Sequence, residues 1–308
     1  MKVKEYFMPI KFVLDTDIGT DVDDAYALLL SLASPELDIV AVTLVHADLD
    51  MRAKIAAKLL TLAKRTDIPV YKGISDPISS NRGHFWGGYE GEGVDLSGAE
   101  GVRVQDGAVD ALIDLAARYG KELVISPIGP LTNIAMAIRK APDVMRGIGR
   151  LCIMASTFSG LGVAGREHNI NADPVAAQEV LNSGIPATVV GLNVTMQVTL
   201  KDENVKGLQG RSPLGDYMAG LAERFFQACG RRWTHMHDPL AVACLVNPSI
   251  VRTEYYHGEV ITEGEDAGMI IYTEEGEPKV DVAVDVDTDA FDEHFISRAY
   301  ALADSVKE

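Results

Sequence analysis

The stretch FVLDTDIGTDVDDAYALLL, residues 12–30, decides the fold because it joins an apolar strand to an apolar helix through an acidic turn. KFVLD predicts a buried strand, and DAYALLLSLAS predicts the helix that follows. Gly19 permits a tight turn between them. The turn and its flanks carry Asp15, Asp17, Asp21, Asp23 and Asp24.

Carboxylates this close together repel one another unless something offsets their charge. Aspartates in a first helical turn gain roughly 0.3–1 kcal/mol each from the helix dipole, which accounts for one or two of them. Carboxylates converging within about 4–6 Å would raise one another's pKa. A hard divalent cation with oxygen ligands removes the conflict, and Ca²⁺ accepts roughly six to eight such ligands. The stretch therefore predicts a metal site.

Strand-like and helical segments alternate through most of the chain, which favours the α/β class. After the opening unit come LDIVAVTLV, PVYKG, ELVISPIG, GRLCIMAS and ATVVGLN as strands, with helical patterns between them. Near-continuous apolar strands of this kind predict a mainly parallel, Rossmann-like open sheet with helices on both faces. No linker rich in Pro, Gly or Ser divides the chain, so we expect a single domain over residues 1–308 with C-terminal elaborations.

Charge and cysteine content exclude several classes of function. The formal net charge is −17 and the basic residues are scattered, which argues against binding to nucleic acid or to anionic membranes. Three cysteines without a CxxC pair indicate a reducing compartment, so we expect a cytoplasmic protein. No stretch approaches the roughly 18 apolar residues of a membrane span, and no secretory signal is visible.

Polar residues follow the predicted strands, where ligands bind in open α/β sheets. DTD ends the first strand, HAD follows the second, GPLTN follows ELVISPI, and REHNINADP follows GRLCIMAS. Further along the chain, WTHMHDPLAVA places His237 and Asp238 together at the head of an apolar helix. Asp238 could be a simple helix cap there, but beside an aspartate cluster this His–Asp pair favours a site.

These motifs together resemble the nucleoside hydrolase family. DTDIGTDVDDAYALLL is similar to its N-terminal signature, DxDPGxDDxxAL. SPIGPLTNIAMAI resembles its GPLTNxA segment, EHNINADPVAAQEVL its ExNxxxDPxAA segment, and HDPLAVA its late HD motif. The matches occur in the family's order and span most of the chain.

The resemblance implies a Ca²⁺ site and a division of roles among the polar residues. Asp17, Asp24 and Asp238 would hold the ion through carboxylates, and Thr132 through its backbone carbonyl. Asp17 would also be the base that takes a proton from the attacking water. His237, with an imidazole pKa near its usual value, would donate a proton to the leaving base. Contacts to the substrate would come from Asp23, Asp48, Glu167, Asn169 and Trp86.

Departures from the family pattern affect the substrate more than the reaction. Two additional residues before Asp23 leave Asp21 without a counterpart. Asp48 stands where Asn is usual, and Arg166 precedes Glu167 where a small residue is usual. The segment HFWGGYEGEG, residues 84–93, could be a lid that stacks Trp86 on the base, or an exposed connection.

The sequence therefore predicts Ca²⁺-dependent hydrolysis of the N-glycosidic bond of ribonucleosides, with inosine and uridine as the first substrates to test. A ring of oxygens would stabilise the oxocarbenium-like transition state. The family resemblance also implies a homodimer or homotetramer. Two alternatives remain: a Mg²⁺-dependent, haloacid-dehalogenase-like phosphatase with Asp15 as nucleophile, although Gly19 stands where that loop has Thr or Val, and a non-catalytic ribose-binding relative.

Overall fold

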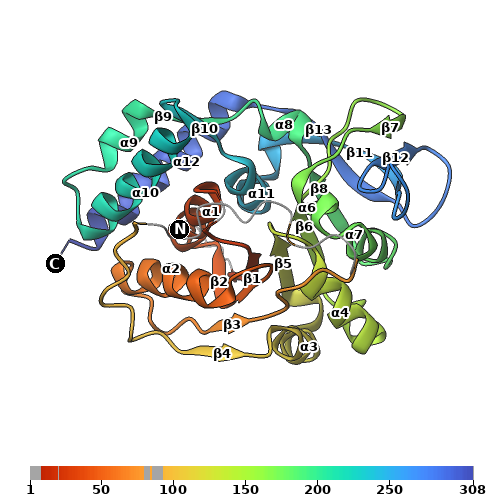
Figure 1. Cartoon of the computed structure of the whole chain (residues 1–308), viewed down its shortest axis with the longest axis horizontal. Helices are drawn as coiled ribbons and strands as arrows, with labels where there is room; N and C mark the ends of the chain where they lie inside the picture. The colour runs from red at the N-terminus through yellow and green to blue at the C-terminus, as the bar shows by residue number, and fades with distance from the viewer. Residues whose placement is uncertain (1–7, 20, 80–83, 85–92, 308) are drawn as a thin grey trace, which may run out of the picture.

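The computed structural model describes residues 8–19, 21–79, 84 and 93–307 (Figure 1). Its centre is an eleven-stranded sheet in the order β4-β3-β2-β1-β5-β6-β8-β13-β11-β12-β7. The parallel part comprises β4 (Val104–Asp106), β3 (Val70–Lys72), β2 (Leu37–Leu44), β1 (Ile10–Thr16), β5 (Leu123–Pro127), β6 (Arg150–Met154), β8 (Ala187–Val190) and β13 (Val280–Val286). The predicted mainly parallel sheet is confirmed.

The C-terminal elaboration extends this sheet with antiparallel strands. β11 (Val251–Val260) pairs with β13, β12 (Ile270–Thr273) with β11, and β7 (Gly162–Ala164) with β12. A separate two-stranded sheet joins β9 (Thr199–Lys201) to β10 (Trp233–His235). The extent of a single domain over residues 1–308 stays a prediction. In the described part of the chain, no helix is long and apolar enough to cross a membrane.

Helices cover both faces of the sheet, as predicted. One face packs against α1 (Asp23–Leu32), α2 (Leu49–Leu62), α10 (Pro213–Cys229), α11 (His237–Val246) and α12 (Thr288–Ser305). The other face packs against α3 (Ala108–Tyr119), α4 (Thr132–Lys140) and α7 (Pro174–Leu181). Phe12 and Leu14 of β1 belong to the first core and Val13 to the second, so alternate side chains enter opposite faces. This explains why the strand is apolar throughout.

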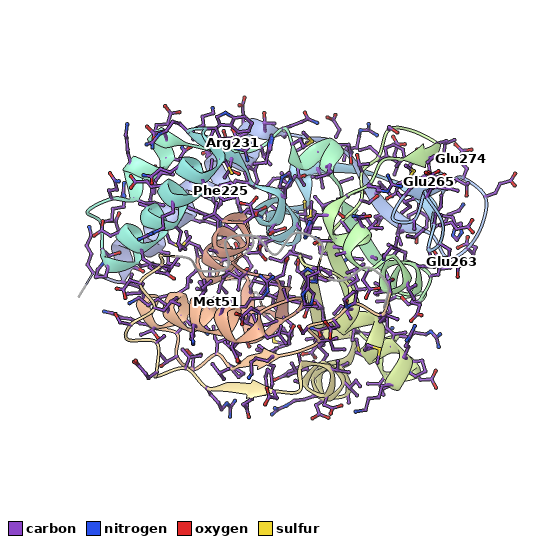
Figure 2. The ribbon with its side chains drawn as sticks, viewed as in Figure 1. Met51, Phe225, Arg231, Glu263, Glu265 and Glu274 are labelled. Atoms are coloured by element: carbon purple, nitrogen blue, oxygen red, sulfur yellow. The ribbon has the colours of Figure 1, made fainter. Side chains whose placement is uncertain are left out.

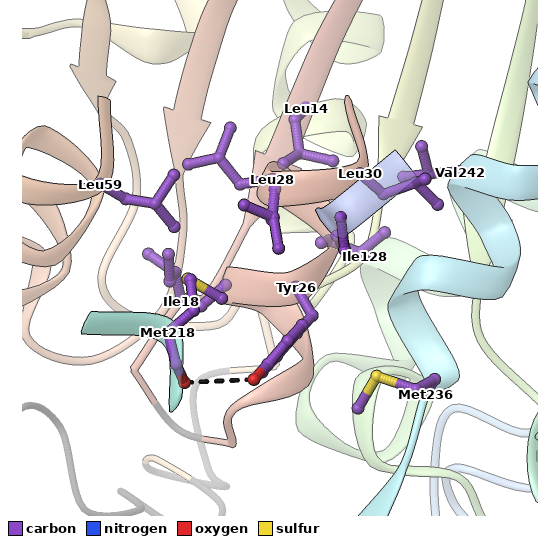
Figure 3. Close-up of a cluster of buried hydrophobic side chains, with 14 of the residues drawn as sticks. Leu14, Ile18, Tyr26, Leu28, Leu30, Leu59, Ile128, Met218, Met236 and Val242 are labelled. Atoms are coloured by element: carbon purple, nitrogen blue, oxygen red, sulfur yellow. Dashed lines mark hydrogen bonds between the residues drawn. The ribbon is translucent and has the colours of Figure 1, made fainter. Parts of the chain in front are cut away.

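Helix α1 is buried on every side, which fixes the acidic turn that leads into it. Residues 23–31 are all buried, because α1 lies between the sheet and the outer helices. Figure 3 shows Leu28 and Leu30 of α1 close to Leu14 of β1 and Val242 of α11. Tyr26 Oη donates a hydrogen bond of 3.1 Å to the carbonyl of Met218 in α10 (Figure 3).

The chain reverses its direction across the sheet between β1 and β5. From β1 it runs outward through β2, β3 and β4, and it then returns to the other side of β1 for β5, β6 and β8. The carboxyl ends of β1 and β5 therefore diverge into a crevice, the usual ligand position in open α/β sheets. The acidic turn begins at this point, directly after β1.

A buried asparagine joins the segments around the crevice. Asn133 in α4 donates to Asp15 Oδ1 at 2.8 Å and to the carbonyl of Leu44 at 3.0 Å. Its Oδ1 accepts from the backbone N–H of Ile74 at 2.9 Å. Asn133 thus links the ends of β1 and β2 to the loop after β3.

We predict that Gly73→Ala destabilises the protein by roughly 1–3 kcal/mol, because overpacking costs about that much. A Cβ at Gly73 would lie 2.5 Å from the carbonyl oxygen of Leu44 and closer still to Asn133 Oδ1. Asn133 would then have to leave its three partners. Urea unfolding of the variant measures the effect.

The matched control is Gly101→Ala, where the added Cβ meets only Thr66 Cγ2, at an ordinary 3.5 Å. Equal stability of the two variants would contradict the proposed role of Asn133 as a cross-link.

Candidate active site and metal centre

The acidic turn brings together three buried carboxylates from two helix N-termini. Asp23 and Asp24 open α1, and Asp238 lies in the first turn of α11. One carboxylate oxygen from each lies within 4.8 Å of the others, and all three residues are buried. The backbone N–H of Asp238 donates to Asp23 Oδ2 at 3.3 Å, and Thr16 Oγ1 donates to Asp24 Oδ1 at 2.5 Å. Asp24 and Asp238, two of the predicted metal ligands, thus lie in one group with Asp23.

Electrostatics in this cluster favour either bound protons or a bound cation. Burial raises the pKa of Asp23, Asp24 and Asp238 well above the usual range, and repulsion from neighbouring carboxylates of the turn raises these pKa values further. Burial also raises the pKa of Asp21 to about 6. A divalent cation would offset this repulsion, and oxygen-only ligands suit Ca²⁺. The three residues therefore fit a hard metal ion.

Asp17 lies beside this group but outside it. Its charge still raises the pKa of both Asp24 and Asp238, so it is close to them. A Cβ added to Gly129 would lie 2.8 Å from Asp17 Oδ1, so the carboxylate packs against the turn that follows β5. Asp23 therefore occupies the place in the three-carboxylate group that the resemblance gave to Asp17.

Arg52, on α2, holds the backbone of the turn in place and was missed by the sequence analysis. It is fully buried, and its guanidinium donates to the carbonyls of Asp17, Ile18 and His46. A basic residue on the apolar face of the DMRAKIAAKLL pattern was the available signal. Its charge also lowers the pKa of Asp24, although the raising effect of burial is larger.

Glu167 and Asn169 form hydrogen bonds that hold neighbouring segments together. Glu167 caps α6 (His168–Ala172), and its carboxylate accepts backbone bonds of 2.8–3.1 Å from Asn169, Ile170 and Ser156. Asn169 Nδ2 donates to the carbonyls of Ile128 and Met154, at 2.8 and 3.0 Å. Both side chains are buried at the carboxyl ends of β5 and β6. Their contacts with a sugar stay predictions.

His237 is half-buried at the start of α11, next to Asp238. Its Nδ1 lies 2.7 Å from Thr195 Oγ1, and its ring centre lies 5.3 Å from that of His235. Loss of water around the ring, with smaller contributions from His235 and Arg231, lowers the pKa of His237 to about 3. The expectation of an ordinary imidazole pKa is therefore wrong, because burial opposes the charged ring.

Thr132, Asp48 and Trp86 were also predicted to belong to the site. Thr132 begins α4, and its hydroxyl donates to Asp173 Oδ2 at 2.8 Å. Asp48 is exposed and caps α2, accepting from the backbone N–H groups of Asp50 and Met51. Trp86 lies outside the described residues. The capping role that the structure gives Asp48 is independent of any substrate.

His46 is a second residue that the sequence analysis missed. It follows β2 with a positive φ of 68°, is 2% exposed, and has its ring 5.1 Å from that of His84 and 6.4 Å from that of His168. Burial lowers its pKa to about 4. Its Nε2 has no hydrogen-bond partner among the described residues. The HAD segment after the second strand, which begins with His46, was the available signal.

A cavity of about 440 Å³ adjoins the acidic turn. Its wall includes Ile18, Gly19 and Asp21 from the turn, and Arg224 and Phe225 from α10. Figure 2 shows Phe225 on α10 and Arg231 in the segment that follows this helix. Asp21, for which the sequence suggested no role, thus lines a mixed polar and apolar cavity next to the carboxylate group.

The chain matches the family described as "Inosine-uridine preferring nucleoside hydrolase" over residues 12–293. It belongs to the nucleoside hydrolase family. Among similar proteins is the pyrimidine-specific ribonucleoside hydrolase RihA of Shewanella sp. strain MR-7, 34% identical and matched over 77% of this chain and 78% of that one. The RihA of Escherichia coli O127:H6 is 31% identical, with 92% and 96% of the two chains matched.

A solved structure supports the same assignment. The purine-preferring ribonucleoside hydrolase from Gardnerella vaginalis superposes with a TM-score of 0.86 at 31% identity, covering 96% of this chain and 99% of that one. The prediction of a nucleoside hydrolase, an enzyme that cleaves ribonucleoside N-glycosidic bonds, is confirmed. The family assignment does not support the phosphatase alternative. Asp15, the nucleophile in that alternative, is fully buried, and its Oδ1 accepts hydrogen bonds from Thr43 and Asn133.

We predict that this nucleoside hydrolase, kept free of metal, loses stability as the pH rises from about 6.5 to 8.5. A carboxylate whose folded pKa is raised keeps its proton in the folded state but not in the unfolded chain, so ionisation at higher pH destabilises the fold. The three clustered aspartates, whose pKa values lie well above the usual range, contribute in this window, and Asp15, with a pKa raised to about 7 by burial, contributes only at its lower end. Histidines of lowered pKa oppose the trend near pH 6.5, where the unfolded imidazoles are still partly charged, and are neutral in both states above about pH 7.5. Thermal unfolding in chelator measures the trend.

Saturating Ca²⁺ should reverse that loss and raise the melting temperature by on the order of 5 °C, because a ligand at 100 times its Kd adds about 2.7 kcal/mol. Asp24→Asn should remove most of the effect of Ca²⁺, whereas Asp285→Asn, at the far end of β13, should keep it. An unchanged response in the Asp24 variant would exclude the cluster as the metal site.

Proposed function

We propose that the chain is a Ca²⁺-dependent ribonucleoside hydrolase that releases ribose and a free nucleobase. The observation that carries this proposal is the convergence of Asp23, Asp24 and Asp238 at the sheet's reversal point, in a chain of this family. A non-catalytic ribose-binding relative would also use such a group to hold an ion, so turnover is the measurement that separates the two functions. The reducing cytoplasm and a homodimer or homotetramer remain sequence-based expectations.

For the metal we propose Asp24 and Asp238 as carboxylate ligands, with Asp17 and the carbonyl of Thr132 completing the protein's share. Asp24 and Asp238 belong both to the ligand set implied by the family and to the structural cluster. When bound, the ion supplies positive charge that orients the sugar hydroxyls and makes the attacking water more acidic. Asp23 then remains available to accept a hydrogen bond from the ribose.

We infer that Asp17 accepts the proton of the attacking water. Its carboxylate adjoins the cluster, and Arg52 holds its backbone, so the base is placed before the substrate binds. Oxygens of Asp23, Glu167 and Asn169 would face the sugar as positive charge develops on it. These groups stabilise the oxocarbenium-like transition state more than the neutral substrate, which is the requirement for catalysis.

For the leaving group we propose His237 as the hydrogen donor to the nucleobase. Since burial lowers its pKa to about 3, the resting ring is neutral at pH 7 and donates a hydrogen bond from Nε2. The C1′–N bond breaks, its electron pair moves to the base nitrogen, and that nitrogen takes its final proton from solvent. The cavity beside Asp21 and Phe225 is our proposed position for part of the nucleobase.

The test of function is release of reducing sugar from a panel of ribonucleosides, with and without chelator. The panel begins with inosine and uridine, because one relative is named pyrimidine-specific and one solved structure purine-preferring. We expect hydrolysis of at least one nucleoside, abolished by chelator and restored by Ca²⁺. Tight ribose binding without turnover would instead identify a non-catalytic relative.

We predict that Asp17→Asn lowers kcat on the best nucleoside by about 10²–10⁴-fold, the range for loss of a general base. The fold should persist, because the backbone carbonyl that Arg52 contacts is unchanged. The comparison is Asp48→Asn, which keeps an oxygen to cap α2. Activity of Asp17→Asn near that of the wild type would exclude this residue as the base.

A further inference from the structure

The ring of His237 is held by a hydroxyl from a separate element, the short helix α8 (Leu192–Thr195). Thr195 is fully buried, and its Oγ1 lies 2.7 Å from His237 Nδ1. Within the described residues, Thr195 Oγ1 makes no second hydrogen bond and His237 Nε2 makes none. One ring nitrogen is therefore occupied by the protein, and the other is left for a ligand.

In the part of the chain that the structure describes, the Thr195 hydroxyl donates no hydrogen bond to a backbone carbonyl of its own helix, which leaves it able to donate to His237 Nδ1. Helical Ser and Thr hydroxyls commonly donate to the carbonyl four residues back, as Ser31 and Thr61 do here at 2.8 Å. In the described structure the corresponding carbonyl, that of Gly191, is bonded by the backbone N–H of Thr195 but not by its hydroxyl. The hydroxyl proton is thus free to be donated to Nδ1.

Either protonation state of the ring then leaves a proton on Nε2. In a neutral ring to which the Thr195 hydroxyl donates, Nδ1 accepts and the single ring proton is on Nε2. In the charged ring, Nδ1–H donates to Thr195 Oγ1, and Nε2 keeps its own proton. The inference therefore does not depend on which state predominates.

Helix α8 is fixed to the framework that also holds Glu167. Asn193 Nδ2 donates to the carbonyl of Ala283 in β13 at 2.8 Å, and its Oδ1 accepts from the N–H of Phe158 at 3.1 Å. Leu192 N–H donates to the carbonyl of Ser156 at 2.9 Å, and Ser156 N–H donates to Glu167 Oε2 at 3.0 Å. A movement of α8 would thus disturb both the His237 side and the Glu167 side of the crevice.

We propose that Thr195 is a positioning residue of this nucleoside hydrolase, which by donating to His237 Nδ1 keeps a proton on Nε2 for the leaving nucleobase. The proposal rests on the proposed function of His237. It explains why a hydroxyl-bearing residue ends a four-residue helix in a fully buried position. It also implies that loss of this hydroxyl affects poor leaving groups selectively.

The test compares Thr195→Val, Thr195→Ser and His237→Ala on two substrates. One is the best nucleoside of the panel, whose base needs a hydrogen donor, and the other is 4-nitrophenyl riboside, whose leaving group needs none. We expect Thr195→Val to lower kcat on the nucleoside by about 10- to 100-fold, the usual effect of losing a supporting hydrogen bond. Its activity on the nitrophenyl riboside should stay within about two-fold, and Thr195→Ser should retain both activities.

The matched control is Thr188→Val, which removes a buried hydroxyl in β8 that accepts from Arg150 at 2.8 Å, away from the crevice. It should leave the ratio of the two activities unchanged. Equal losses on both substrates in Thr195→Val, or no loss on the nucleoside, would overturn the positioning role.

A measurement on the wild-type protein covers the case in which Thr195→Val does not fold. The ¹⁵N chemical shifts of the histidine rings, with His237 assigned by comparison with His237→Gln, report the tautomer directly. A neutral ring protonated on Nε2 supports the proposal, and one protonated on Nδ1 overturns it. A wild type that hydrolyses neither substrate would refute the proposed function, while the tautomer would still decide whether Thr195 donates.

Discussion

Carboxylates crowded into a turn from which water is largely excluded are the constraint on which the rest of this site depends. Asp23, Asp24 and Asp238 are buried within reach of one another, and Asp15, Asp17 and Asp21 lie near them. Without a counter-charge, burial and repulsion raise the pKa of Asp23, Asp24 and Asp238 and so favour their protonated forms. The fold must therefore hold the turn rigidly enough that repulsion between the carboxylates does not open it. The contacts that oppose this repulsion can be named.

Three kinds of contact hold the turn closed. Arg52 binds its carbonyls from α2, Asn133 ties Asp15 to the end of β2, and the N-termini of α1 and α11 meet at the carboxylates. Helix N-termini favour negative charge, so two of them at one point offset part of the repulsion. The apolar burial of α1 supplies the rigidity, because a helix packed on every side cannot shift to relieve its first turn. A cation bound at the group of Asp23, Asp24 and Asp238 would offset the remaining repulsion without requiring the turn to move.

The two flanks of the crevice are chemically different. On one flank, the side chains of Glu167 and Asn169 form hydrogen bonds with backbone groups. These bonds fix the positions of both side chains in the absence of a sugar. On the other flank, His237 has one ring nitrogen bound by Thr195 and one left open. Relatives named for pyrimidine and for purine nucleosides share this fold. Base preference is therefore expected to depend on side chains around the crevice, such as Arg224, Phe225 and His46, more than on the carboxylates.

The sequence by itself determined the α/β class, the parallel sheet and the family, because strand periodicity and ordered motifs are local properties of the chain. It also identified Asp24 and Asp238 as partners, although 214 positions separate them. Only the tertiary structure placed Asp23 inside the carboxylate group, revealed Arg52 and His46, and showed Asp48 capping a helix. Burial in the tertiary structure also lowers the pKa of His237, and the fold brings Thr195 within hydrogen-bond distance of its ring. These features depend on burial and on contacts between distant segments, which set pKa values and hydrogen-bond partners and leave no local pattern in the sequence.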